Sequence, residues 1–214
     1  MPHQNRVTPF GEIVALPGRG LLMGNRGVLH DENKRIVRQY QSRRWIACRL
    51  EYKGVRRRIM QPRRYTELFF LDEAAALSAG HRPCAECRRD DYKRFTNLWA
   101  QAHGGPSGAD AMDAVIHADR MLHGAKRTWR AQLRALPNGS YVAIDDEAWL
   151  LWQGQLLAWS DAGYTGRGSA RVPDLVDVLT PQCIVSVIRA GYTPDVHPSA
   201  LLPQPRSKPN DVAQ

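Results

Sequence analysis

The sequence predicts an α+β fold, with a mixed N-terminal region, a helical segment and an antiparallel β-rich C-terminal region. Three observations support this class: short runs with strand character come first, apolar residues at helical spacing follow, and closely spaced strands joined by turns end the chain. The 214 residues, 43% of them hydrophobic, can bury a core as one large domain or as two small ones.

The N-terminal region combines strands with one short helix. Strands are expected at Ile13–Leu16, Trp45–Tyr52, Val55–Met60 and Leu68–Leu71. Lys53-Gly54 fits the turn of a hairpin. Asp72 can accept hydrogen bonds from the first turn of a helix, and Gly80 can end that helix.

Residues 84–102 predict a longer helix that buries one face. The apolar side chains at helical spacing are Tyr92, Phe95, Leu98 and Trp99. Cys84 and Cys87 are therefore expected at the N-terminus of this helix, where the helix dipole favours thiolate over thiol.

The C-terminal part continues with a helical stretch over 111–136, in which Gly124 is a candidate break. Antiparallel strands are expected at Tyr141–Ile144, Ala148–Trp152, Leu156–Trp159 and Leu175–Leu179. Thr180 as a cap and Pro181 at the first position predict a last helix, which Gly191 ends.

The expected organisation has four parts. They are a basic region with a Cys-x-x-Cys pair (1–102), a linker rich in Gly, Pro and Ser (103–110), a helix with a β-rich region (111–200) and a disordered tail (201–214). No apolar run approaches the ~18 residues that span a bilayer, and the N-terminus lacks the apolar core of a secretory signal. Four cysteines do not form a disulfide framework in a chain of this length, so a cytoplasmic protein without a membrane partner is expected.

Positive charge is concentrated in the N-terminal part. The chain has a net charge of +9, and residues 1–94 hold 20 of its 30 Lys and Arg but 10 of its 21 acidic residues. Arginine binds phosphate through a planar fork, so a nucleic-acid surface is favoured over a merely solvated basic face. The candidate nucleic-acid-binding residues are Arg43, Arg44, Arg56, Arg57, Arg58, Arg63, Arg64, Arg82, Arg88 and Arg89.

Residues 67–90 include the run ELFFLDEAAALSAGHRPCAECRRD. This run resembles the second half of the zinc-binding, methylphosphotriester module of Ada-type DNA alkylation-repair proteins. The shared pattern is a strand ending in Phe-Phe, a short Glu-Ala-rich helix and Ala-Gly-(aromatic)-Arg-Pro-Cys-x-x-Cys, with His81 at the aromatic position.

The resemblance implies a small α/β DNA-binding module, here enlarged at its N-terminal side, with a four-cysteine zinc site and a setting in DNA repair. Cys84 and Cys87 match the second pair of zinc ligands. The first pair, which contains the methyl-accepting cysteine of that family, has no counterpart here, since Cys48 stands alone upstream. Methyl transfer is therefore not inferred.

Zinc prefers four nitrogen or sulfur ligands. Cys48, Cys84 and Cys87 could supply three, and His81 or His30 the fourth. The alternatives are a related fold without its metal, with Cys48 as a buried strand cysteine, and a redox-active pair. A redox pair is less favoured, because thioredoxin-like motifs follow a strand whereas this pair follows a helix.

Two further segments have functional interpretations. Asp113 and His117 share a helix face, and His117 and Asp119 are candidate catalytic residues of a metal-dependent nuclease; an exposed helix with an Asp–His pair is the plainer explanation. The Gly-rich, Arg-bearing loop 18–27 could approach a phosphate through its backbone, or simply connect two strands.

These observations favour a bacterial-type cytoplasmic protein that binds nucleic acid, DNA rather than RNA, through an Ada-like module with a structural zinc. An enzyme acting on nucleic acid, as a nuclease or in repair, and a metal- or redox-responsive interaction protein are the alternatives.

Overall fold

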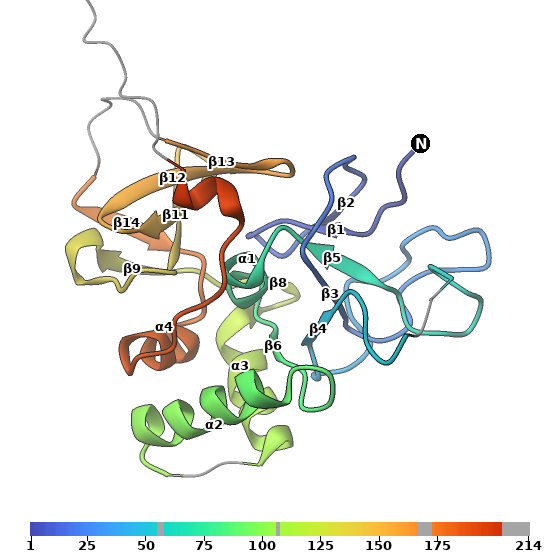
Figure 1. Cartoon of the computed structure of the whole chain (residues 1–214), viewed down its shortest axis with the longest axis horizontal. Helices are drawn as coiled ribbons and strands as arrows, with labels where there is room; N and C mark the ends of the chain where they lie inside the picture. Colours follow the sequence, from blue (N-terminus) through green and yellow to red (C-terminus); the bar gives the residue numbers. More distant parts are fainter. Residues whose placement is uncertain (55–57, 106–107, 167–172, 203–214) are drawn as a thin grey trace, which may run out of the picture.

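The computed structural model describes residues 1–54, 58–105, 108–166 and 173–202. Within these ranges it contains four α-helices, two six-stranded sheets and one two-stranded sheet, which confirms the α+β class. Figure 1 shows the two large sheets on either side of α1, with the other helices along one edge of the molecule. No helix in the described ranges is long and apolar enough to cross a membrane.

Six short strands form the N-terminal sheet. In spatial order they are β2 (Ile13–Val14), β1 (Arg6–Val7), β5 (Leu68–Phe70), β3 (Leu22–Asn25), β4 (Ile46–Arg49) and β6 (Arg82–Pro83). The pairs β1–β5 and β4–β6 are parallel, and the others are antiparallel. The strands expected at 13–16, 45–52 and 68–71 are confirmed in shortened form. Of the run Val55–Met60, residues 55–57 lie outside the described ranges, and residues 58–60 form no strand.

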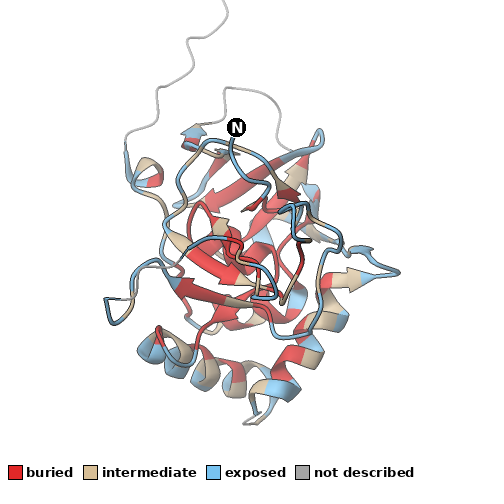
Figure 2. Cartoon of the chain, turned by 90° about the vertical axis from the view of Figure 1, so that its right-hand side faces the viewer, coloured by how far each residue is buried: buried red, intermediate tan, exposed pale blue. Residues whose placement is uncertain are grey.

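Helix α1 (Glu73–Ser78) lies at the centre of the molecule and is buried along its whole length. As predicted, Asp72 caps it, since its Oδ1 accepts a hydrogen bond from the backbone N–H of Ala75 at 2.9 Å. Ala74 and Ala75 pack on the C-terminal sheet, and Ala76 on the N-terminal sheet. Small side chains therefore let one helix contact both sheets, and Figure 2 shows the continuous buried centre that results.

Helices α2 (Arg89–His103), α3 (Ala109–Arg120) and α4 (Gln182–Arg189) share one core cluster. Phe95 and Trp99 of α2 pack there with Met112 of α3 and Ile184 of α4. The predicted linker 103–110 is shorter than expected, because α3 begins at Ala109. The parts before and after it are packed against each other rather than separated.

The prediction of a helix over 111–136 is wrong beyond Arg120, where α3 ends. The chain instead forms a hairpin of β7 (Met121–Leu122) and β8 (Ala125–Lys126), followed by β9 (Trp129–Gln132) and the 3₁₀ turn η1 (Leu133–Ala135). His123 and Gly124 have φ of 50° and 82°, and two successive left-handed residues make the tight turn of a β-hairpin.

The C-terminal sheet is entirely antiparallel, as predicted. Its order is β13 (Gly163–Gly166), β12 (Gln155–Ser160), β11 (Glu147–Trp152), β10 (Tyr141–Ile144), β14 (Leu175–Val178) and β9. The capping role expected of Thr180 is wrong, because its hydroxyl accepts from the Tyr141 N–H at 2.9 Å. The N–H of Cys183 in the first turn of α4 donates instead to Asp119 at 2.6 Å. The 3₁₀ turn η2 (Pro198–Leu201) reaches the first residue of the predicted tail (201–214), and residues 203–214 lie outside the described ranges.

Candidate metal centre

Strand pairing brings three cysteines together at the edge of the N-terminal sheet. Cys48 lies on β4, opposite Met23 of β3. β6 runs parallel to β4, and the Cys84 N–H donates to Ala47 O at 3.0 Å, which places the turn after β6 beside Cys48. Cys87 completes that turn before α2 begins. The Cys-x-x-Cys thus precedes the helix instead of occupying its first turn.

The sulfur atoms of Cys48, Cys84 and Cys87 lie within 4.8 Å of one another. All three residues are buried, and the intervening Ala85 and Glu86 are exposed, so the cluster lies just beneath the surface. Tetrahedral zinc with bonds of about 2.3 Å holds its sulfur ligands roughly 3.8 Å apart. A small contraction of this group would therefore accommodate a zinc ion.

The three thiols have different acidities. A hydrogen bond with Cys48, and after it the backbone N–H groups of Cys87 and Glu86, lower the pKa of Cys84 to about 5 against the opposing effect of burial. The same contact with Cys84, together with burial, raises the pKa of Cys48 far above its usual range. Burial raises the pKa of Cys87, although the Arg49 N–H donates to its sulfur at 3.4 Å. A cation would be needed for all three to ionise together.

Neither histidine considered as a fourth ligand joins the sulfur atoms. His81 is fully buried between Trp45 and Phe70, and its Nε2 accepts a hydrogen bond from Arg26 Nε at 3.3 Å. His30 contacts the hydroxyl of Thr66 through Nδ1 at 2.7 Å. Among the residues that the structure describes, the metal-binding group therefore consists of the three cysteines.

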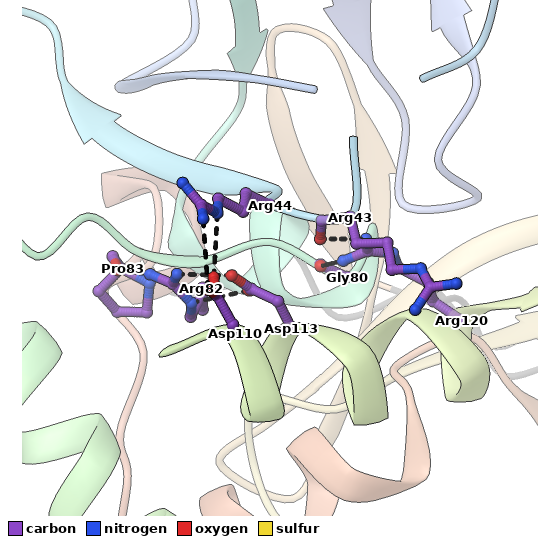
Figure 3. A network of polar contacts seen from close by, with 8 residues as sticks. All are labelled: Arg43, Arg44, Gly80, Arg82, Pro83, Asp110, Asp113 and Arg120. Carbon is purple, nitrogen blue, oxygen red and sulfur yellow. Dashed lines mark hydrogen bonds and ion pairs between the residues drawn. The ribbon is translucent and has the colours of Figure 1, made fainter. Parts of the chain in front are cut away.

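Two of the predicted nucleic-acid-binding arginines have structural roles instead. Arg82 forms a two-point ion pair with Asp113 at 2.8 and 2.7 Å (Figure 3), and both side chains are buried. Arg88 lies between Glu73 and Asp91, with ion pairs of 2.8 and 2.9 Å. Because these guanidinium groups are buried and neutralised, they are not available to a phosphate backbone.

The remaining predicted arginines lie at the surface where the structure describes them. These exposed residues are Arg43, Arg44, Arg58, Arg63, Arg64 and Arg89. Arg44 already has one charged partner, since it forms an ion pair of 3.0 Å with Asp110 in the first turn of α3. Arg56 and Arg57 fall outside the described ranges.

The candidate catalytic residues of α3 have structural partners. His117 accepts a hydrogen bond from Arg120 Nη2 at its Nδ1 (3.0 Å) and packs edge-on against Tyr40. Asp119 accepts the Cys183 N–H described above. These contacts explain both residues without a nuclease site, and within the described ranges they form no metal-binding group.

The Gly-rich segment 18–27 is not a loop throughout, because Leu22–Asn25 form β3, and side chains hold the backbone of Gly18. The Gly18 N–H donates to the Asp161 carboxylate at 2.8 Å, and the Gly18 carbonyl accepts from Arg6 Nε at 2.6 Å. Gly18 therefore connects the two sheets, and its own amide is not free to bind a phosphate.

Comparisons with known proteins leave the site to be interpreted on its own geometry. No family model matches the chain, and no curated protein or solved structure matches it either.

Proposed function

We propose that this chain is a nucleic-acid-binding protein, with DNA as its preferred ligand, whose N-terminal region is held together by a structural zinc ion at Cys48, Cys84 and Cys87. The observation that supports zinc is the approach of Cys48, from β4, to the Cys-x-x-Cys pair after β6. A redox pair needs two cysteines, whereas a third buried cysteine whose sulfur lies within 4.8 Å of the other two suits a metal site. Zinc, when bound, would cross-link two segments far apart in the sequence.

Nucleic-acid binding rests on the distribution of the exposed arginines. Arg58, Arg63 and Arg64 lie on the loop between β4 and β5, and within the described ranges they take part in no ion pair. Unpaired, exposed guanidinium groups can displace the counterions of a phosphate backbone, which is the main source of sequence-independent affinity. The C-terminal half, which has no net positive charge, is expected to contribute little.

The test is a pair of matched double variants in a binding titration. Arg63→Gln/Arg64→Gln should weaken binding to duplex DNA and reduce the slope of log K against log salt by about 1 for each phosphate that the variant no longer neutralises. Arg130→Gln/Arg134→Gln, which removes two exposed arginines of the C-terminal half, should leave affinity and slope unchanged. Fluorescence anisotropy with duplex DNA, single-stranded DNA and RNA of one sequence would also rank the ligands.

Two outcomes would contradict the proposal: no binding to any of these ligands at low salt, or an equal decrease in affinity in the two double variants. Cleavage of the nucleic acid that depends on a divalent cation would favour the enzyme alternative.

A further inference from the structure

A cavity of about 630 Å³ lies where β3 ends and β4 begins, and three cationic side chains line it: Arg26, Arg120 and Lys126. The turn before β2 and β2 itself, the β7–β8 hairpin and the segments next to β3 and β4 form its walls. The lining also includes the exposed residues Glu12 and Ala125, so the cavity is open to solvent.

Trp45 fixes the positions of the two arginines. The Cζ atoms of Arg26 and Arg120 lie 3.9 and 3.7 Å from the centre of the Trp45 ring. Two guanidinium groups this close to one ring cannot share a face, so they enclose the indole from both sides. Backbone carbonyls orient them further, since Arg26 Nη1 donates to Gly11 O at 2.9 Å and Arg120 Nη1 to Gly80 O at 2.6 Å (Figure 3 shows the Arg120 contact).

The positive charge of this group is not neutralised. The ion pairs found in the described part of the chain involve none of the three cations. Both arginines are about 1% exposed, yet Arg26 Nη2 and Arg120 Nε have no hydrogen-bond partner. Burial, and after it repulsion from neighbouring cations, lowers the pKa of Lys126 to about 7.

The nearby acids compensate this charge only in part, because Asp113 attracts Arg120 and Asp119 attracts Lys126 without forming an ion pair with them. Asp113 is bound to Arg82, and Asp119 accepts the Cys183 N–H. Of the described residues that line the cavity, Glu12 alone is acidic, and it is exposed. A buried guanidinium without a charged partner is strongly unfavourable, so the retention of Arg26 and Arg120 beside Lys126 indicates that an anion belongs here.

We propose that this cavity binds a phosphate group through Arg26, Arg120 and Lys126. Guanidinium forks match the oxygen atoms of phosphate, and a phosphate monoester or inorganic phosphate has the two negative charges that suit three cations better than a carboxylate does. Both faces of Trp45 are covered, so a base does not stack on it. The volume exceeds that of one phosphate and leaves room for the group that carries it.

This site is separate from the exposed arginines and from the cysteines. The phosphate-site proposal therefore does not depend on the proposed DNA surface. The test is calorimetry of the full chain with inorganic phosphate, a nucleoside 5′-monophosphate, and one oligonucleotide with either a 5′-phosphate or a 5′-hydroxyl. Preference for the phosphorylated over the hydroxyl oligonucleotide would identify a nucleic-acid end as the source of the phosphate. Binding of inorganic phosphate or the mononucleotide without that preference would identify a small molecule.

Introduction of a charge at the exposed residue Ala125 gives a pair of variants with little risk to folding. Ala125→Glu should weaken phosphate binding by about tenfold or more, whereas Ala125→Lys, of similar bulk, should bind at least as well as the wild type. Lys126→Met should also weaken binding by about tenfold, and Lys93→Met, on the surface of α2, should not.

Two results would overturn the proposal. One is the absence of saturable binding of every phosphate probe up to roughly 10 mM. The other is equal affinity of Ala125→Glu, Ala125→Lys and the wild type. Binding of the 5′-hydroxyl oligonucleotide would persist in either case if the DNA surface alone is correct, so the two proposals can fail separately.

Discussion

Asp72 is the residue on which the central contacts converge. Its carboxylate accepts hydrogen bonds from the Ala75 N–H, the Tyr164 hydroxyl and the His197 N–H, at 2.9, 2.6 and 2.8 Å. One buried side chain therefore caps α1 and ties it to the C-terminal sheet and to the segment that follows α4. Burial nevertheless outweighs these donors and raises the pKa of Asp72 to about 6.

This raised pKa predicts how stability depends on pH. The unfolded carboxyl titrates near 3.9, so between about pH 4 and 6 the folded chain holds a proton that the unfolded chain has released. The contribution of Asp72 to the free energy of unfolding is complete below about pH 4. It falls by about 3 kcal/mol as the pH rises to about 6. In urea titrations, the stability advantage of the wild type over Asp72→Asn should shrink from pH 4 to pH 8. A difference that stays constant across this range would contradict the prediction.

Two features require glycine at position 80: its backbone conformation and the proximity of the Arg120 side chain. Its φ is +82°, and a Cβ there would lie 2.4 Å from Cδ of the buried Arg120. Gly124 has the same φ with no atom within 4 Å, which makes it the matched control. Gly124→Ala should cost about 1–2 kcal/mol of backbone strain, and Gly80→Ala a further 1–3 kcal/mol because Arg120 must move. Equal destabilisation of the two variants in chemical denaturation would show that Arg120 is not held where the structure places it.

At the scale of elements, the ion pair of Arg82 and Asp113 connects β6 to α3. The pair of Arg44 and Asp110 makes a similar connection one helical turn earlier, but there both side chains are exposed (Figure 3). Exposed ion pairs contribute little, whereas removal of one partner of a buried pair leaves an unpaired charge.

The two pairs allow a matched comparison of stability. Arg82→Met should destabilise the fold by about 3–5 kcal/mol, and Arg82→Met/Asp113→Leu should recover most of that stability. Arg44→Met should change stability by less than about 1 kcal/mol. A double variant no more stable than Arg82→Met, measured by urea denaturation, would argue against this role for the buried pair.

The elements that could be predicted are those with strong local signals. The capped helix α1 and the hairpins of the C-terminal sheet have their caps, turns and alternation within a few residues, and they are confirmed. The strands β1 and β6 contain two residues each and have no pattern of their own, because pairing with β5 and β4 creates them. The helix predicted over 111–136 ends at Arg120, where the β7–β8 hairpin begins, and the turn of that hairpin contains the candidate break Gly124.

At the scale of the whole molecule, packing continues across the predicted linker. The helices before and after it share one cluster, and α1 contacts both large sheets. No pattern in the sequence relates Arg82 to Asp113, or Arg26 to Arg120 and Lys126, because tertiary packing alone brings them together. The proximity of Cys84 and Cys87 could be predicted from their spacing in the sequence. The position of Cys48 beside it depends on the parallel pairing of β4 and β6.

The zinc content of the purified protein is the most direct test of the central proposal. Elemental analysis after purification without chelators, under reducing conditions, should find one zinc per chain in the wild type and none in Cys48→Ala or Cys84→Ala. Cys183→Ala should retain it, since Cys183 lies in the helical core away from the cluster. A wild-type protein without zinc, or a Cys48→Ala variant that keeps it, would contradict the proposed three-cysteine centre.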